Sequence, residues 1–182
     1  MAKSCNLLSC ITKENCQYQV AGVKALYLIN YDPKNEFILD DDGVTIKEIK
    51  LADNTLKAYK VDFIDNTASW TDDLAVNGNG GKYRTHTVNF TIGEYTHTVL
   101  NQSNALSMGK FTVVVVDKSD RVVCLGRRNG LSATSFNYAS GAADADATGW
   151  TVVMAGTEME VGQLLTGEKA VSDIADCTIV TP

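Results

Sequence analysis

Few residues of this chain have the types and spacing that catalysis or ligand binding requires. Residues 78–82 (GNGGK) are the segment most similar to a phosphate-binding loop. That motif needs a serine or threonine directly after the lysine and a helix behind it. Here Tyr83 follows the lysine, and the residues beyond it alternate as in a strand. We therefore interpret this run as a flexible turn.

The acidic run Asp40, Asp41 and Asp42, followed by Gly43, carries carboxylates of the kind that bind divalent cations. A calcium loop of the EF-hand type also needs a glutamate at its twelfth position. Counted from Asp40, that position is occupied by Leu51. We interpret the run as a solvated hairpin turn, and we interpret residues 144–146 in the same way.

The cysteines and histidines form no motif for a metal or a nucleophile. Structural zinc sites use closely spaced cysteine pairs with two further ligands, whereas the first three cysteines are separated by four and five residues. An odd number of cysteines cannot all pair within one chain, so reduced thiols are expected. The five are Cys5, Cys10, Cys16, Cys124 and Cys177.

The two histidines, His86 and His97, have no nucleophile elbow and no cysteine–histidine signature around them. The sequence therefore predicts no catalytic residues, no metal site and no cofactor. This favours a binding or assembly role over an enzyme.

The length and the charge of the chain further limit the classes of protein to which it can belong. The chain has 182 residues and a formal net charge of -6, so it suits one domain and lacks the basic footprint of a general nucleic-acid binder. No stretch approaches the roughly 18 apolar residues of a membrane-spanning helix. The apolar run before Cys10 is too short for a signal peptide, so we expect neither membrane insertion nor export.

The hydrophobic pattern predicts many short strands separated by turns. One helix is expected over residues 95–108, ending at Gly109. The predicted fold is mainly β, an antiparallel β-sandwich or open barrel of about eight or nine strands with one flanking α-helix. We expect an N-terminal arm (1–20), a β-sandwich domain (21–160) and a C-terminal arm (161–182). The expected strands are residues 23–31, 36–39, 44–51, 56–64, 83–92, 111–116, 121–125, 131–138 and 149–157, with one more short strand at 177–180.

Three stretches of the chain together carry a resemblance to a known family. They are residues 20–31 (VAGVKALYLINY); residues 109–117 (GKFTVVVVD) with 121–125 (RVVCL) and 129–131 (NGL); and residues 140–146 (SGAADAD) with 149–152 (GWTV). Over about residues 20 to 160 the chain resembles the small tail proteins of tailed bacteriophages and prophages of gut bacteria, including crAss-like phages. Residues 122–124 (VVC) replace the more usual aromatic pair, which leaves the subfamily open.

The resemblance implies a tail-tube-like subunit of the virion tail, assembled in the host cytoplasm. Such subunits join edge to edge into a ring of a tube or collar, which contacts neighbouring tail or connector proteins and lets DNA pass without specific binding. No catalytic residues are carried over, and no membrane is involved. The acidic charge agrees with a DNA conduit, because like charge keeps the duplex from sticking. Candidate residues of interface loops are Asp40, Asp41, Asp42, Trp70, Asn79, Arg127, Arg128 and Asp144.

Two other interpretations remain open at this point. Trp70, Tyr83 and Tyr138, if exposed, suit a carbohydrate- or receptor-binding β-sandwich of a phage fibre or capsid decoration. A small hydrolase is supported only by the two histidines and scattered polar residues.

Overall fold

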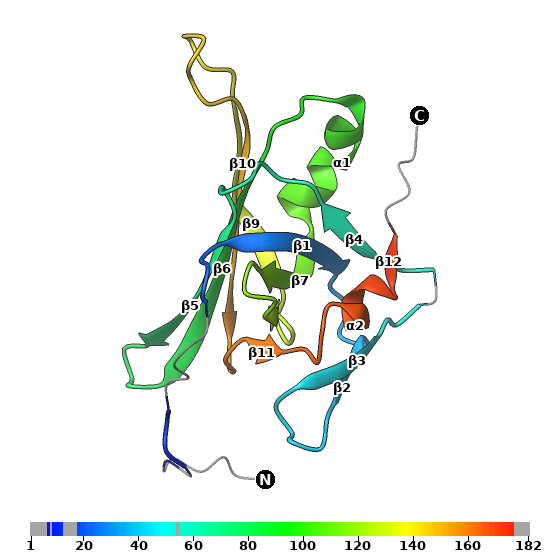
Figure 1. Ribbon diagram of the computed structural model, residues 1–182, viewed down its shortest axis with the longest axis vertical. Coiled ribbons are helices and arrows are strands. Elements are labelled where there is room, and N and C mark those ends of the chain that lie inside the picture. Colours follow the sequence, from blue (N-terminus) through cyan, green and yellow to red (C-terminus); the bar gives the residue numbers. More distant parts are fainter. Residues whose placement is uncertain (1–6, 8, 13–17, 54, 177–182) are drawn as a thin grey trace.

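The protein is described by a computed structural model, which covers residues 7, 9–12, 18–53 and 55–176. Over these residues the chain forms twelve strands and two helices (Figure 1). The elements are β1 (Val23–Asn30), β2 (Glu36–Leu39), β3 (Ile46–Lys50), β4 (Ala58–Val61), β5 (Ser69–Val76), β6 (Lys82–Ile92), α1 (His97–Met108), β7 (Lys110–Asp117), β8 (Val122–Leu125), β9 (Leu131–Ala139), β10 (Gly149–Glu158), β11 (Gln163–Leu164), α2 (Lys169–Ser172) and β12 (Ala175–Asp176).

Ten of the strands belong to one sheet, with the order β12-β4-β1-β7-β9-β10-β6-β5 and with β8 and β11 branching from β7. All pairings in it are antiparallel except that of β12 with β4. Strands β2 and β3 form a separate hairpin. The predicted fold class, a mainly β antiparallel fold with an open sheet and a flanking helix, is confirmed.

Strand β7 is the point at which the sheet divides. Its first residues, Lys110 and Phe111, pair with β9, whereas its later residues, from Val113 to Val116, pair with β8. Strands β9, β10, β6 and β5 continue from one end of β7; we call these four strands the upright sheet, since they run nearly vertically in Figure 1. The turn at residues 128–130 does not close a hairpin. It carries the chain from β8 to β9, because these two strands pair with different parts of the same edge of β7.

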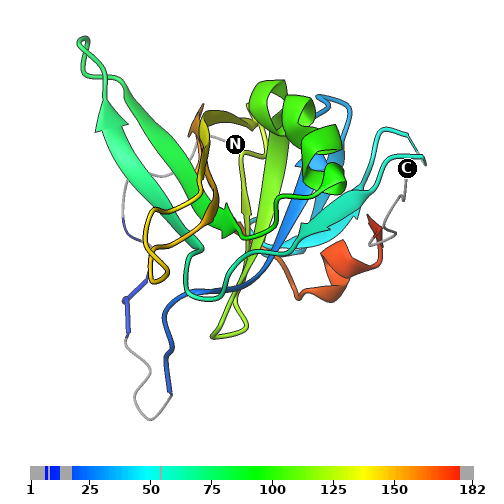
Figure 2. The ribbon, with the colours of Figure 1, turned by 90° about the horizontal axis from the view of Figure 1, so that it is seen from above.

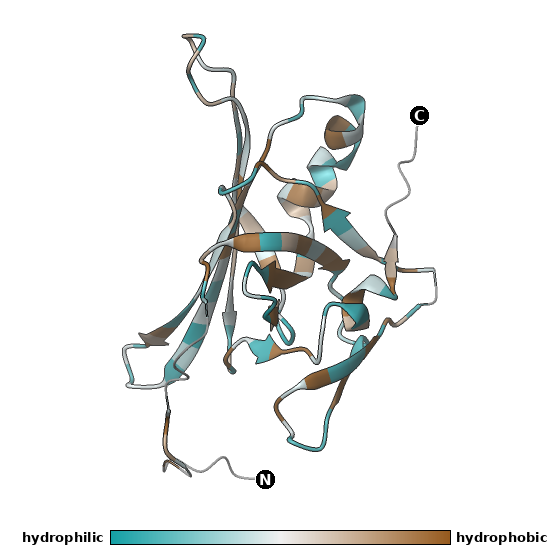
Figure 3. Cartoon of the chain, viewed as in Figure 1, coloured by the Kyte–Doolittle hydropathy of each residue, from teal (hydrophilic) through white to brown (hydrophobic). Residues whose placement is uncertain are grey.

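The central strands are buried on both faces. One face of the β1–β7 pair, with Leu26 and Val115, packs against residues such as Phe90 and Met154 of the upright sheet. The other face packs under the β2–β3 hairpin and α2, in a second apolar cluster that includes Val171. Figure 3 shows this central region as the most apolar part of the chain. Burial on both faces explains why β1 is apolar at successive positions and not only at alternate ones.

Helix α1 forms where it was predicted and packs beside β9. Thr96 caps its first turn by accepting a hydrogen bond from the Val99 amide. Gly109 ends the helix with an ordinary negative φ of -73°, so it is not needed for a left-handed turn. A Cβ atom at this position would lie 2.3 Å from the Ala105 carbonyl oxygen and 2.7 Å from the Phe111 ring. Close approach, and not positive φ, selects glycine here.

Two expectations from the sequence are wrong. Residues 70–73, expected to lie in a loop, are part of β5, which pairs with β6 along its whole length. Residues 161–176, expected to be part of an arm, contribute β11, α2 and β12, which pair with β8 and β4 and cover the second apolar cluster. The possible strand at residues 177–180 lies outside the described residues, as does most of the expected N-terminal arm.

We predict that Gly156→Ala destabilises the fold by about 1–3 kcal/mol, because overpacking forces backbone shifts. A Cβ atom at Gly156 would lie 2.4 Å from the carbonyl oxygen of Gly130, in the segment that crosses over β10. Urea denaturation measures the free energy of unfolding. Gly167→Ala is the matched control, because its Cβ would meet nothing within 4 Å. Equal effects of the two substitutions would contradict this packing.

Candidate functional site

The candidate site is the upright sheet, together with the polar groups at the lower end of it. No group of three or more His, Cys, Asp or Glu side chains in the described part of the chain is placed to hold a metal ion. Of the helices within the described ranges, none is long and apolar enough to cross a membrane. The features that remain for binding are the outer face and the two edges of the upright sheet.

The outer face of the upright sheet is polar but almost uncharged. Along β6 the buried side chains alternate with partly exposed ones, which confirms the half-buried strand predicted for residues 83–92. The strand register extends this alternation to β5, β9 and β10. Asp73 is the one charged side chain on this face, and no lysine or arginine lies there. The outward residues are Ser69, Thr71, Asp73, Ala75, Tyr83, Thr85, Thr87, Asn89, Thr91, Ser132, Ser135, Asn137, Thr151, Val153, Ala155 and Thr157.

Both edges of the upright sheet lack a strand partner. Among the described residues β5 pairs only with β6, and Figure 2 shows the β5–β6 hairpin projecting away from the body. At the opposite edge, Leu131 and Ser132 of β9 pair with β7, but from Ala133 onward β9 pairs only with β10. Three antiparallel pairings separate β5 from β9, so the two edge strands run in opposite directions.

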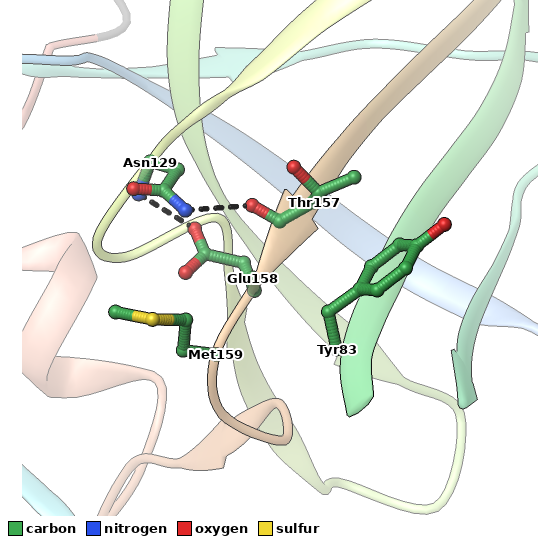
Figure 4. A pocket seen from close by; sticks show the side chains of 5 residues that line it. All are labelled: Tyr83, Asn129, Thr157, Glu158 and Met159. Atoms are coloured by element: carbon green, nitrogen blue, oxygen red, sulfur yellow. Dashed lines mark hydrogen bonds between the residues drawn. The ribbon is translucent and has the colours of Figure 1, made fainter. Parts of the chain in front are cut away.

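A buried carboxylate holds the loop between β8 and β9. Glu158 is 1% exposed, and its Oε1 accepts hydrogen bonds from the backbone amides of Arg128 (3.2 Å) and Asn129 (2.8 Å). The Asn129 side chain in turn donates to the Thr157 carbonyl oxygen at 2.8 Å (Figure 4). A shallow pocket of about 230 Å³ is lined by Tyr83, Asn129, Thr157, Glu158 and Met159. The pocket is open and small, and its polar groups mainly fix the loop.

The adjacent arginines are used within the chain. Arg127 forms a two-pronged ion pair with Glu160, with distances of 2.6 and 2.8 Å, and Arg128 lies 3.2 Å from the same carboxylate. The hydrogen bond to Glu160 raises the pKa of Arg127 above its ordinary value. The sequence predicted both arginines as interface residues; Arg127 is largely buried in this pair, whereas the Arg128 side chain is 52% exposed.

His86 lies under the same loop, where it has no nucleophile beside it. Its Nδ1 accepts a hydrogen bond from the Gly126 amide at 3.2 Å, which places the proton of the neutral ring on Nε2. Nε2 lies 3.4 Å from an Asp72 oxygen, which is a polar contact without the geometry of a hydrogen bond. His97 is an exposed first residue of α1. Neither histidine has a serine or cysteine as a hydrogen-bond partner in the described part of the chain.

Asp72 accepts hydrogen bonds from two different segments at the lower end of the upright sheet. Its carboxylate accepts hydrogen bonds from Arg84 at 2.7 Å and from the Gly162 amide at 2.9 Å. Partial burial acts to raise the pKa of Asp72, but the hydrogen bonds from Arg84 and Gly162 and the charge of Arg84 together lower it. The residue thus links β5, β6 and the segment after β10.

The remaining residues predicted for interfaces lie far apart in the fold. Asp40, Asp41 and Asp42 form the tip of the β2–β3 hairpin, where Asp42 accepts hydrogen bonds from Val44 and Thr45. Asn79 lies in the β5–β6 turn, and Asp144 lies in the exposed β9–β10 loop. These three tips are not brought together within one chain, and their role in subunit contacts stays a prediction.

Trp70 is not an exposed binding aromatic. It packs partly buried against the core, and its Nε1 donates a hydrogen bond to Asp117 at 2.8 Å. The aromatic cluster of the surface lies elsewhere: Tyr95 and Trp150 are stacked, with ring centroids 5.4 Å apart, and Tyr138 meets Tyr95 at 4.7 Å. The sequence singled out Tyr138 but not its partners, because Tyr95 reaches it from the turn before α1.

The sequence analysis missed three acids that are used inside the fold: Glu158 and Glu160, which are buried, and Asp72, which is partly buried. Glu158 has one usable signal, since it continues the inward period of two set by Val152 and Met154 on β10. The pairing of Glu160 with Arg127 is a tertiary contact over 33 residues and leaves no local pattern.

We compared the chain with protein-family profiles, with curated proteins and with solved structures, and none of them matches. The function therefore has to be argued from the geometry and from the sequence stretches described above.

We predict that Asp72→Asn lowers the free energy of unfolding by about 2 kcal/mol at pH 7, because a charge-assisted hydrogen bond is lost. The folded-state pKa of Asp72 lies below the unfolded value of about 4. Its stabilisation is therefore present above pH 4 and is lost as the pH falls through the folded-state pKa. Denaturation curves from pH 7 down to pH 2 should show the difference from wild type shrinking.

Asp73→Asn is the control for this experiment, since Asp73 is the exposed neighbour on the same strand. It should change the free energy of unfolding by less than about 0.5 kcal/mol at pH 7. A pH-independent effect of Asp72→Asn would contradict the role given to its charge.

We predict that Cys124 does not react with iodoacetamide in the folded protein. It is buried, and burial raises the pKa of its thiol to about 12, although the charge of Arg127 acts in the opposite direction. Since the thiolate is the reactive form, modification should require unfolding. Peptide mass spectrometry after alkylation at pH 8 measures this, with the exposed Cys10 as the internal control. Equal labelling of both residues would show that β8 opens readily.

Proposed function

We propose that this protein is a structural subunit of a bacteriophage tail, joined edge to edge with copies of itself into a ring of the tube or collar through which DNA is ejected. The observation that carries the proposal is the upright sheet, whose two edge strands run in opposite directions and have no strand partner on their outer side, apart from the first two residues of β9; helix α1 packs beside β9. The sequence stretches that resemble small phage tail proteins support the same assignment.

Opposite edge directions allow the antiparallel pattern to continue from copy to copy. When β5 of one copy lies beside β9 of the next, every neighbouring pair in the joined sheet is antiparallel, as within the subunit. Such a contact is head-to-tail, so it closes into a ring when the rotation between copies closes. Closure removes the exposed edges, which are otherwise sites of aggregation.

The two faces of the upright sheet are suited to different surroundings. The inner face is occupied by the main apolar cluster, so the outer face is the one that would line a central channel. That face carries hydroxyl, amide and small side chains with Asp73 as its one charge. Without lysine or arginine it has nothing to replace the counterions of a DNA backbone. This supports passage of DNA without specific binding.

The other parts of the proposal follow from this role. The partners are copies of the chain and neighbouring tail or connector proteins, and the location is the virion tail after assembly in the host cytoplasm. The carbohydrate- or receptor-binding alternative is less well supported, because Trp70 is partly buried and bonded to Asp117. Exposed Tyr95 and Tyr138 are the aromatic residues that favour it.

We predict that the purified protein forms closed rings or tubes of one diameter. Sedimentation velocity over a range of concentrations, together with negative-stain electron microscopy, measures this. Antibody labelling or mass spectrometry of purified virions then tests the location. A protein that stays monomeric at the highest attainable concentration and is absent from virions would contradict the proposal, as would a positive glycan array with no assembly.

A further inference from the structure

We infer that copies of this chain are sealed to one another by an apolar contact on the inner side of the joined edges. In this contact Leu74 and Val76 of β5 in one copy meet Tyr138 and Tyr95 at the β9 edge of the next. The inference rests on the proposed ring and names the side chains that hold it together.

The β5 side of the contact is an apolar pair without a cover. Leu74 is 56% exposed and Val76 is 59% exposed. Both follow the parity of Trp70, which packs into the core, so they continue the inner face of the sheet along the edge strand. Exposed apolar side chains on an edge strand without a strand partner promote aggregation of a monomer. Their presence is explained if a second copy covers them.

The β9 side presents aromatic rings on the same face of the sheet. Tyr138 is 41% exposed and Tyr95 is 56% exposed. Tyr138 lies opposite Trp150 in the β9–β10 register, and Trp150 is stacked on Phe136 with ring centroids 4.5 Å apart. Because the tyrosines are already held by ring contacts, little side-chain freedom is lost when a neighbour packs on them.

Charge decides which two edges meet. Two β5 strands paired with each other can bring the exposed Asp73 carboxylates of both copies close together, and like charges across a strand pair are destabilising. Asp72 adds little to this repulsion, because it is paired with Arg84 within the subunit. Strand β9, from Leu131 to Ala139, contains no charged residue. A β5 edge is therefore better matched to a β9 edge than to a second β5 edge, which makes the contact head-to-tail.

The positions along the strands add a condition on the geometry. In the strand register Leu74 lies opposite Arg84 of β6, whereas Tyr138 lies level with Ile92 of β6, at the opposite end of the upright sheet. The two edges must then be offset along the strand direction. A closed sheet with tilted strands contains a stagger of this kind, so the proposed contact requires neighbouring copies to be staggered along the strands.

The inference is tested by blocking one edge at a time. We expect the double variant Leu74→Lys/Val76→Lys to lose assembly, with a dissociation constant raised by about 100-fold or more, because two buried aliphatic groups are replaced by charges. We expect Tyr138→Lys to do the same through the other edge. Sedimentation velocity measures assembly, and urea denaturation of the monomer checks that each variant still folds.

Mixing the two variants distinguishes a head-to-tail contact from others. The double variant keeps an intact β9 edge, and Tyr138→Lys keeps an intact β5 edge. An equal mixture should therefore form dimers with one copy of each and should not grow into rings. Leu74→Met and Thr71→Gln are the controls, because the first keeps an apolar side chain and the second changes the other face of β5; both should assemble like wild type.

The outcomes separate this inference from the function it rests on. Wild-type rings that survive Leu74→Lys/Val76→Lys would overturn the inference and leave the ring in place. Tyr138→Lys that assembles normally, or a mixture without dimers, would overturn the assignment of β9. A monomeric wild type would contradict the proposed function, and the inference would fail with it.

Discussion

The structure depends on the burial of strand β7 on both faces. Its side chains are apolar at both parities, so each face needs a cover. The upright sheet covers one face, and the β2–β3 hairpin with α2 covers the other. This explains why residues 161–176, which carry little pattern of their own, fold back onto the chain. They complete the second apolar cluster, and Val171 of α2 is fully buried there.

The division of β7 between two partners explains the polar groups at the lower end of the upright sheet. The chain must cross from β8 to β9 over a short distance, and the crossing uses Gly126 and Gly130 at positive φ, with values of 67° and 73°. The loop lies against buried strands, so its amides need acceptors. Glu158 and the Nδ1 of His86 supply them. The buried histidine is thus a consequence of the topology, and the same loop requires the bare backbone of Gly156.

The sequence predicts the elements of this fold better than their partners. Hydrophobic period and turn residues place β1, β6, β7, β10 and α1 correctly, because these signals are local. The sequence did not predict β5, since its inward side chains, Trp70, Asp72, Leu74 and Val76, are mixed in polarity and only the first is packed in the core. The crossing after β8 also escaped prediction, because a good turn signal does not specify which strand comes next. Contacts between residues that lie far apart in the sequence leave no pattern in the local sequence.

The same reasoning explains why the edges of the upright sheet differ. Charged side chains on an edge strand prevent it from pairing with the wrong partner. Strand β5 carries two adjacent aspartates, and Arg84 neutralises one of them, Asp72, inside the subunit. Strand β9 has no charged residue, and on the side away from β10 only its first two residues pair with another strand, β7. Two unlike edges on one sheet cannot both be satisfied by a symmetric pair of chains. Both edges are covered when β5 of each copy pairs with β9 of the next copy. A row of such contacts leaves no edge exposed only when it closes into a ring.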